Sequence, residues 1–180
     1  MTKAQKRFGF FAALAVGIFL IAVFAPVIAT HDPNASVLSN AIQPPSAEHW
    51  FGTDKMGRDL FSRVVFGTRT SILSTLVLVV GILLVGGFLG IVAGYVGGVT
   101  ETFIMRIADM MVSFPGMALA IALAGLLGGS LFSAIAAIMA VSWTKYARMA
   151  RSLVLKVRHQ DYVLAAQLSG TRNRDILLRY

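Results

Sequence analysis

The sequence has no cysteine and few charged residues. Only 13% of its 180 residues are charged, whereas about 25% are charged in an average soluble domain. The absence of cysteine excludes disulfide bonds, thiolate nucleophiles and metal sites built from cysteine. The low charge, combined with 57% hydrophobic residues, excludes an ordinary soluble domain, because such a fold could not bury so much aliphatic sequence.

Charge is also absent from three long stretches of the chain, residues 8–31, 70–100 and 110–144. A helix of about 20 apolar residues spans a bilayer, so each stretch is long enough to cross. As a single helix, residues 110–144 would be about 50 Å long, against a hydrocarbon core of about 30 Å. This last stretch therefore has to contribute to two crossings.

These stretches predict an all-α fold, a polytopic transmembrane helical bundle. Its four expected spans are residues 8–29, a helix within residues 71–99, residues 103–127 and residues 131–149. Gly128, Gly129 and Ser130 form the natural turn between the last two spans. Pro115 falls within the third span and should kink it, because proline removes a helical hydrogen bond.

Basic residues near both ends of the chain predict its orientation. Lys3, Lys6 and Arg7 precede the first span, and the residues after 144 contain many more lysines and arginines than acids. The positive-inside rule therefore places both termini in the cytoplasm and residues 31–70 outside. The net charge of +8 then indicates contact with anionic lipid headgroups rather than with nucleic acid. A cleaved signal peptide is an alternative interpretation of residues 8–29.

Four glycines recur at every fourth position of the second span: Gly86, Gly90, Gly94 and Gly98. This spacing places them on one helix face, where small residues let a neighbouring helix approach closely in lipid. We therefore predict that they are helix-packing positions rather than residues that line a pore. In the third span, Arg106 and Asp109 share a face and can pair with each other or face protein.

The segment 31–70 combines turns with opposite charges. Asp54 with Arg58, and Asp59 with Arg63, have the four-residue spacing that suits ion pairs on short helical turns. A metal site of His31, His49 and nearby carboxylates is conceivable, but no spacing typical of metal ligands supports it. We therefore expect solvated histidines, and the sequence predicts no metal site, no catalytic residue and no cofactor.

Residues 161–170 are predicted to form a short helix, which Asp161 begins and Gly170 ends. The pattern suits two interpretations equally well. The helix is either a docking element for a soluble partner or an amphipathic helix that lies on lipid.

The chain resembles the second permease subunit of binding-protein-dependent ABC importers of the dipeptide, oligopeptide and nickel family. Three patterns carry the resemblance, and they occur in the family's order along most of the chain from His49 onward: His49-Trp50-Phe51-Gly52-Thr53-Asp54-x-x-Gly57-Arg58-Asp59-x-x-Ser62-Arg63 with Gly67-x-Arg69-x-Ser71; Arg106-x-x-Asp109 with Phe114-Pro115; and Asp161-Tyr162-Val163-x-Ala165-Ala166-x-x-x-Gly170. One departure is Leu164, where many members have glutamate before the paired alanines.

The resemblance implies a type I permease fold in a bacterial inner membrane. It implies as partners a second homologous permease subunit, two ATP-binding subunits and an extracytoplasmic substrate-binding protein. The third pattern is similar to the loop that docks the ATPases, so the expected coupling residues are Asp161, Tyr162, Val163, Ala165, Ala166 and Gly170. ATP hydrolysis is expected on the partner subunits, and the sequence has no phosphate-binding loop of its own. Family members continue with two more spans beyond the position of Tyr180.

The expected organisation is therefore a flank and first span in residues 1–30, an extracytoplasmic segment in 31–70, core spans in 71–149 and an incomplete ATPase-coupling loop in 150–180. Residues 143–154 are more similar to nickel or metal-chelate permeases than to peptide permeases. A channel or secondary transporter is the alternative function, although an ion-coupled carrier usually has an ionisable site in mid-membrane. A membrane enzyme is a further alternative, but the spans offer almost no residues for catalysis.

Overall fold

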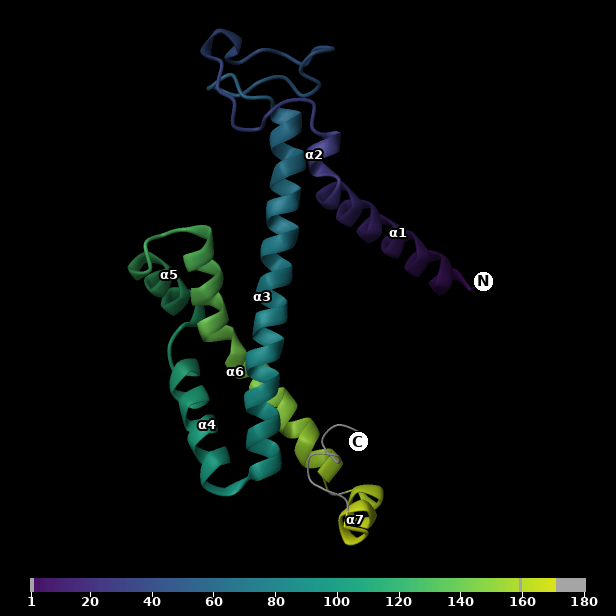
Figure 1. The fold of residues 1–180 in the computed structure, drawn as a ribbon, viewed down its shortest axis with the longest axis vertical. Helices are drawn as coiled ribbons and strands as arrows, with labels where there is room; N and C mark the ends of the chain where they lie inside the picture. Colours follow the sequence, from purple (N-terminus) through teal and green to yellow (C-terminus); the bar gives the residue numbers. More distant parts are fainter. Residues whose placement is uncertain (1, 159, 171–180) are drawn as a thin grey trace. The chain divides into compact units, whose positions relative to one another are not determined.

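A computed structural model describes residues 2–158 and 160–170. In this part of the chain, every regular element is a helix, and one isolated β-bridge joins Thr53 and Asp59. The all-α prediction is therefore confirmed. The chain divides into two compact units, Met1–Leu76 and Val77–Tyr180. Helix α3, Leu60–Val96, begins in the first unit and ends in the second (Figure 1).

The first unit begins with helix α1, Lys3–Val23, which Thr2 and Gln5 cap reciprocally. A short helix α2, Ala25–Ile28, follows and has proline in its first turn, where the missing N–H costs least. The chain then runs through turns and the 3-10 helix η1, Leu38–Asn40, to the start of α3. The carboxylate of Asp59 accepts the backbone N–H of Ser62 at 2.7 Å and so caps α3.

Ion pairs in residues 31–59 follow the predicted spacing only in part. Arg58 Nε donates to Asp54 Oδ2 at 2.8 Å, as the four-residue spacing predicts. The predicted pair of Asp59 with Arg63 is wrong, because the Asp59 carboxylate is buried and contacts His49 Nδ1 at 3.0 Å. Arg63 Nε instead lies 3.7 Å from Asp54 Oδ2. Tertiary contacts thus override a local spacing rule.

Hydrogen bonds hold both of these carboxyl groups in their ionised form. Burial raises the pKa of Asp54, but N–H groups of Arg58 and Met56 and the Arg58 guanidinium outweigh it, so the pKa lies below its usual value. Burial likewise raises the pKa of Asp59. Hydrogen bonds from the N–H and hydroxyl of Ser62 and from the His49 ring outweigh this effect, so the pKa of Asp59 also lies below its usual value. Solvated histidines were also expected here, and this is wrong for His49, which is 5% exposed.

The described part of the second unit contains the rest of α3 and four further helices: α4, Gly98–Val112; α5, Gly116–Leu126; α6, Leu131–Arg158; and α7, Asp161–Leu168. α5 and α6 pack together as a hairpin. The predicted turn between them is confirmed, with positive φ at Gly128 and Gly129. Ser130 caps α6 by accepting the backbone N–H of Ser133 at 3.1 Å.

Two helices, α1 and α3, are long and apolar enough to cross a membrane, and the pair α4 and α5 makes a third candidate if it counts as one span. That pair bends by 90° at its break, where Pro115 is the N-cap of α5, so the predicted kink is a full break. α6 covers the expected fourth span but is not selected by hydropathy in the described residues. Residues 2–158 and 160–170 thus contain two or three candidate spans, where the sequence predicted four.

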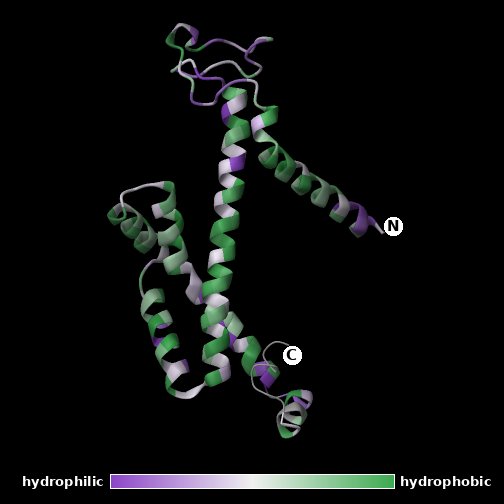
Figure 2. Ribbon diagram, viewed as in Figure 1, coloured by the Kyte–Doolittle hydropathy of each residue, from purple (hydrophilic) through white to green (hydrophobic). Residues whose placement is uncertain are grey.

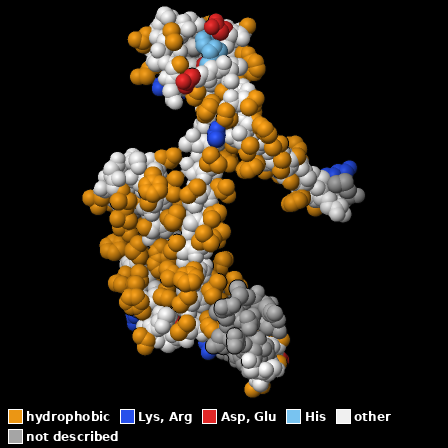
Figure 3. Space-filling model, in the orientation of Figure 1, with side chains coloured by type: hydrophobic (Ala, Val, Ile, Leu, Met, Phe, Trp, Pro, Cys, Tyr) orange, Lys and Arg blue, Asp and Glu red, His pale blue; other side chains and the backbone are white. Residues whose placement is uncertain are grey.

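Two helices, α3 and α6, extend beyond the spans that the sequence predicted. α3 begins at Leu60 rather than near residue 71, and α6 continues to Arg158 rather than ending near residue 149. The reason is that charge-free stretches predict the lipid-embedded part of a helix, whereas arginine and lysine continue a helix readily. Hydrophobic residues run along α1, α3 and α5 (Figure 2), and hydrophobic side chains cover much of the visible surface of the molecule (Figure 3).

Candidate functional site

The candidate site is the end of the second unit where α3, α4 and α6 meet ahead of α7. The predicted glycine face of α3 lies against α6. A Cβ on Gly86 would lie 2.6 Å from the carbonyl oxygen of Trp143 and 2.9 Å from Cβ of Tyr146. One on Gly94 would lie 2.9 Å from Cβ of Val154, and one on Gly90 would overlap the next turn of α6. Only glycine fits at these three positions without moving the helices.

Gly98 was predicted to share this face, and that prediction is wrong. α3 ends at Val96, and Gly97 and Gly98 turn the chain into α4 with φ of 69° and 58°. Nothing lies within 4 Å of a Cβ added to Gly98. The four-residue spacing continued past the end of the helix, so it no longer described one face. The sequence also missed Gly81, at which an added Cβ would meet the side chain of Met139.

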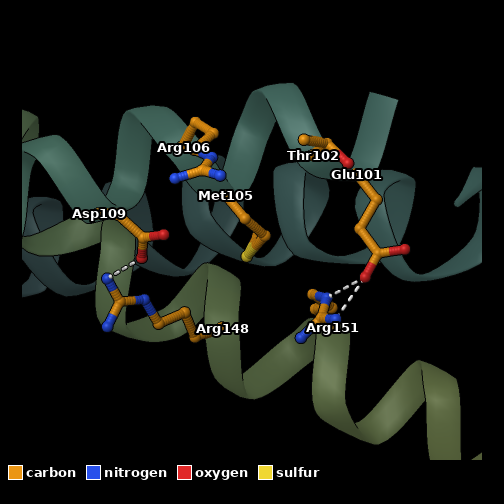
Figure 4. Close-up of a pocket in the computed structure, with 7 residues that line it drawn as sticks. All are labelled: Glu101, Thr102, Met105, Arg106, Asp109, Arg148 and Arg151. Atoms are coloured by element: carbon orange, nitrogen blue, oxygen red, sulfur yellow. Dashed lines mark hydrogen bonds and ion pairs between the residues drawn. The ribbon is translucent and has the colours of Figure 1, made fainter. Parts of the chain in front are cut away.

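Two ion pairs join α4 to α6 (Figure 4). Arg151 Nε donates to Glu101 Oε1 at 2.6 Å, and Arg148 Nη2 donates to Asp109 Oδ1 at 2.8 Å. Arg148 also donates to the carbonyl oxygen of Ala108 at 3.3 Å. Since residue 101 pairs with 151 and residue 109 with 148, α4 and α6 run antiparallel here, whereas the glycine contacts make α3 and α6 parallel.

A pocket of about 440 Å³ opens beside these pairs, lined by Glu101, Thr102, Met105, Arg106, Asp109, Arg148 and Arg151. Arg106 lies between the two pairs on α4, and no ion pair with it occurs among the described residues (Figure 4). Arg106 and Asp109 share a face as predicted, but Asp109 pairs with Arg148 and not with Arg106. Glu101 and Arg151 were not predicted from the sequence. The available signal was the spacing of the charges: the acids Glu101 and Asp109 lie two helical turns apart, and the arginines Arg148 and Arg151 lie one turn apart.

The last turn of α6 is tied to the end of α3. Arg158 Nη1 donates to the carbonyl oxygen of Tyr95 at 3.2 Å. Carbonyl groups in the last turn of a helix lack a partner within the helix, and a basic side chain can satisfy them. With the Gly94 contact and the Glu101–Arg151 pair, this bond fixes the end of α6 to both α3 and α4.

Helix α7 follows this fixed end of α6 and packs against it. Val163 is buried, whereas Asp161, Tyr162 and Ala165 are exposed. Gly170 has a φ of 76°, as expected of a glycine that ends a helix. The side chain of Ala166 lies outside the described part, and so do residues 171–180. Leu168, which the sequence did not single out, is 90% exposed on the last turn of α7.

The family described as "Binding-protein-dependent transport system inner membrane component" matches residues 86–180, which include the glycine face, the ion pairs and α7. Among curated relatives, the probable D,D-dipeptide transport system permease protein DdpC of Escherichia coli (strain K12) is 48% identical over 159 residues, 88% of this chain and 53% of its own. The dipeptide transport system permease protein DppC of Alkalihalophilus pseudofirmus is 42% identical over 89% of this chain and 53% of its own.

The nickel transport system permease protein NikC of Escherichia coli (strain K12) is 39% identical over 86% of this chain and 58% of its own. The chain thus spans about half the length of the curated relatives that it matches. The family match covers more than half of the chain, and it covers the segments whose geometry forms the candidate site. The chain belongs to the family of inner-membrane permease components of binding-protein-dependent transport systems.

Proposed function

We propose that this chain forms part of the permease subunit of an ABC importer, and that α7 docks on a cytoplasmic ATPase. The permease performs no covalent chemistry and provides part of the translocation pathway. A second homologous permease subunit, two ATP-binding subunits and an external substrate-binding protein complete the importer. The family match and the transport names of the relatives support the class of function.

One observation carries the docking proposal: the end of α6 is fixed on two sides immediately before α7 begins. Arg151 binds Glu101 of α4, and Arg158 binds the end of α3. A force applied to α7 by a closing ATPase pair would therefore be passed to both α3 and α4, because these contacts link the end of α6 to both helices. This is the rigid-body type of coupling, in which packed elements switch between two arrangements.

The proposed orientation places the N-terminus and α7 in the cytoplasm and residues 31–70 outside. The basic residues that precede α1 and those that follow residue 144 support this orientation. It requires an even number of crossings, and we propose α6 as the fourth. The first half of α6, residues 131–144, has no charged residue, and two of its later arginines are paired with α4.

The proposed solute is a short peptide or a nickel complex. A relative named for D,D-dipeptide transport is 48% identical, and one named for nickel transport is 39% identical. The similarity of residues 143–154 to nickel permeases therefore does not separate these two solutes. Uptake of radiolabelled dipeptide and of nickel by cells with and without the full-length subunit would distinguish them.

The 180 residues contain no cysteine, so a single introduced cysteine tests the docking proposal once any cysteine in the rest of the full-length protein has been replaced by serine. The Leu168→Cys variant of the full-length protein would be coexpressed with its ATPase subunits and treated in membranes with a thiol-to-amine crosslinker. We expect a crosslinked permease–ATPase product, because Leu168 is 90% exposed on α7. The matched control is Leu126→Cys, which is 84% exposed on α5 and should give no such product.

A second variant separates docking on protein from binding to lipid. Ala165 is exposed on α7, so Ala165→Glu adds a negative charge to the proposed contact without filling a core position. We expect fewer ATPase subunits to copurify with this variant than with Leu38→Glu, whose position is 75% exposed and lies outside the candidate spans. Equal recovery from both variants, or equal crosslinking at positions 168 and 126, would contradict the docking role and favour a helix that lies on lipid.

A further inference from the structure

Three potential metal ligands come together in the first unit, in the segment that precedes α3. Ligand atoms of His31, Glu48 and His49 all lie within 4.8 Å of one another. The two imidazole rings have centroids 4.7 Å apart and are tilted by 37°. Histidine and acidic side chains lie close together on this segment (Figure 3). The two histidines are far apart in the sequence, so their meeting is a property of the fold.

His49 is buried in an orientation that suits a metal ligand. Its Nδ1 lies 3.0 Å from the Asp59 carboxylate, which fixes the ring and places the proton on Nδ1. His49 is 5% exposed, and its Nε2 is a buried atom without a hydrogen-bond partner among the described residues. A buried polar atom without a partner is costly. A carboxylate on one ring nitrogen and a metal on the other is the common arrangement of metal-binding histidines.

The backbone also positions His31. Its N–H donates to Ser62 Oγ at 3.0 Å, which ties it to the first turn of α3. Its Nδ1 lies 3.0 Å from the hydroxyl of Thr30, which leaves Nε2 for a ligand. Glu48 is adjacent to His49 and exposed, so its side chain can rotate toward the two rings.

We propose that His31, Glu48 and His49 bind a divalent transition-metal ion of the Zn²⁺ and Ni²⁺ class. Imidazole suits these ions, whereas Mg²⁺ and Ca²⁺ prefer oxygen ligands throughout. Two imidazoles and one carboxylate leave a coordination position open for water or another ligand. Bonds of about 2.1 Å bring tetrahedral ligands to about 3.4 Å from one another, so the three ligand atoms, which lie within 4.8 Å of one another, need only small side-chain movements to bind one ion.

The site belongs to the first unit alone and does not depend on the proposed transport function. Its test is Zn²⁺ binding to the purified full chain in detergent, without a histidine tag, measured by competition with a chromophoric chelator. We expect one saturable Zn²⁺ per chain, no competition from Mg²⁺, and at least about tenfold weaker binding after His31→Ala, Glu48→Ala or His49→Ala.

Two comparisons keep this test decisive. Since Glu48 is exposed, Glu48→Ala leaves the fold intact even where the His49→Ala variant fails to fold. The third histidine of the sequence is His159, and His159→Ala should bind Zn²⁺ as tightly as the unchanged chain. The proposal is overturned by the absence of saturable binding, or by binding that His31→Ala and Glu48→Ala leave unchanged.

Discussion

Replacing Gly86 with alanine would test whether close packing of α3 on α6 stabilises the second unit. The new Cβ would lie 2.6 Å from the Trp143 carbonyl oxygen, whereas ordinary contacts begin at 3.4 Å. The helices would have to separate by about 0.8 Å, and overpacking of this kind costs about 1–3 kcal/mol. Alanine also gains about 1 kcal/mol over glycine within a helix, so the measured loss is smaller than the steric cost.

The adjacent glycine provides the matched control. Gly87 lies in the same helix, and nothing is within 4 Å of a Cβ added there. Gly87→Ala has the same gain in helix propensity and no steric cost. The difference in unfolding free energy between the two variants therefore isolates the close contact, and we expect Gly86→Ala to be less stable by about 1–3 kcal/mol.

The assay is reversible unfolding of the purified chain in mild detergent titrated with SDS, followed by tryptophan fluorescence. The backbone of Trp143 lies at the contact, and with Trp50 replaced by phenylalanine Trp143 is the single tryptophan of the 180 residues and reports on this part of α6. Equal unfolding free energies for the two variants would show that the glycine face is not under close packing. A more stable Gly86→Ala variant would show that α3 and α6 are not in contact in detergent.

Two further predictions concern charged groups. The side chains of Glu101 and Arg151 are less exposed than those of Asp109 and Arg148. In double-mutant cycles, the coupling energy of Glu101 with Arg151 should therefore exceed that of Asp109 with Arg148, which should be less than about 1 kcal/mol. Asp54 has a pKa below its ordinary value of 3.8, so its contribution to stability is complete above that value and is lost as the pH falls through the lower pKa of the folded state. Thermal unfolding from about pH 6 to about pH 3 should therefore show a smaller loss of stability for Asp54→Asn than for the unchanged chain, and equal losses would contradict this reasoning.

Local features of the chain were predictable because they depend on neighbouring residues. Absence of charge predicted the apolar helices, and Pro115 predicted a kink at the position where the structure has a break between α4 and α5. Gly128 and Gly129 predicted the turn before α6, and in the structure both have positive φ. The glycine spacing predicted Gly86 and its two successors on the face that lies against α6.

Contacts between distant residues were not predictable in this way. Four-residue spacing favours a pair of Asp59 with Arg63, but the fold offers Asp59 the His49 ring and a helix N-terminus. The spacing of the two histidines of the candidate metal site did not predict that they meet. They lie close together because a hydrogen bond to Ser62 of α3 holds His31 in place. Sequence spacing describes neighbours on one helix, whereas these partners are brought together by the chain's return to the start of α3.

The charges of α6 show why hydropathy alone counts fewer spans than the charge-free stretches predict. A hydropathy window treats each arginine as if it faced lipid alone. In the structure, Arg148 and Arg151 are paired with acids of α4, and Arg158 binds the end of α3. Charged residues in membrane helices typically pair with one another or with backbone carbonyls and face protein. Three of the five basic residues that lower the hydropathy of α6 therefore also bind it to its neighbours, which agrees with the proposed place of α6 between the docking helix α7 and the membrane spans.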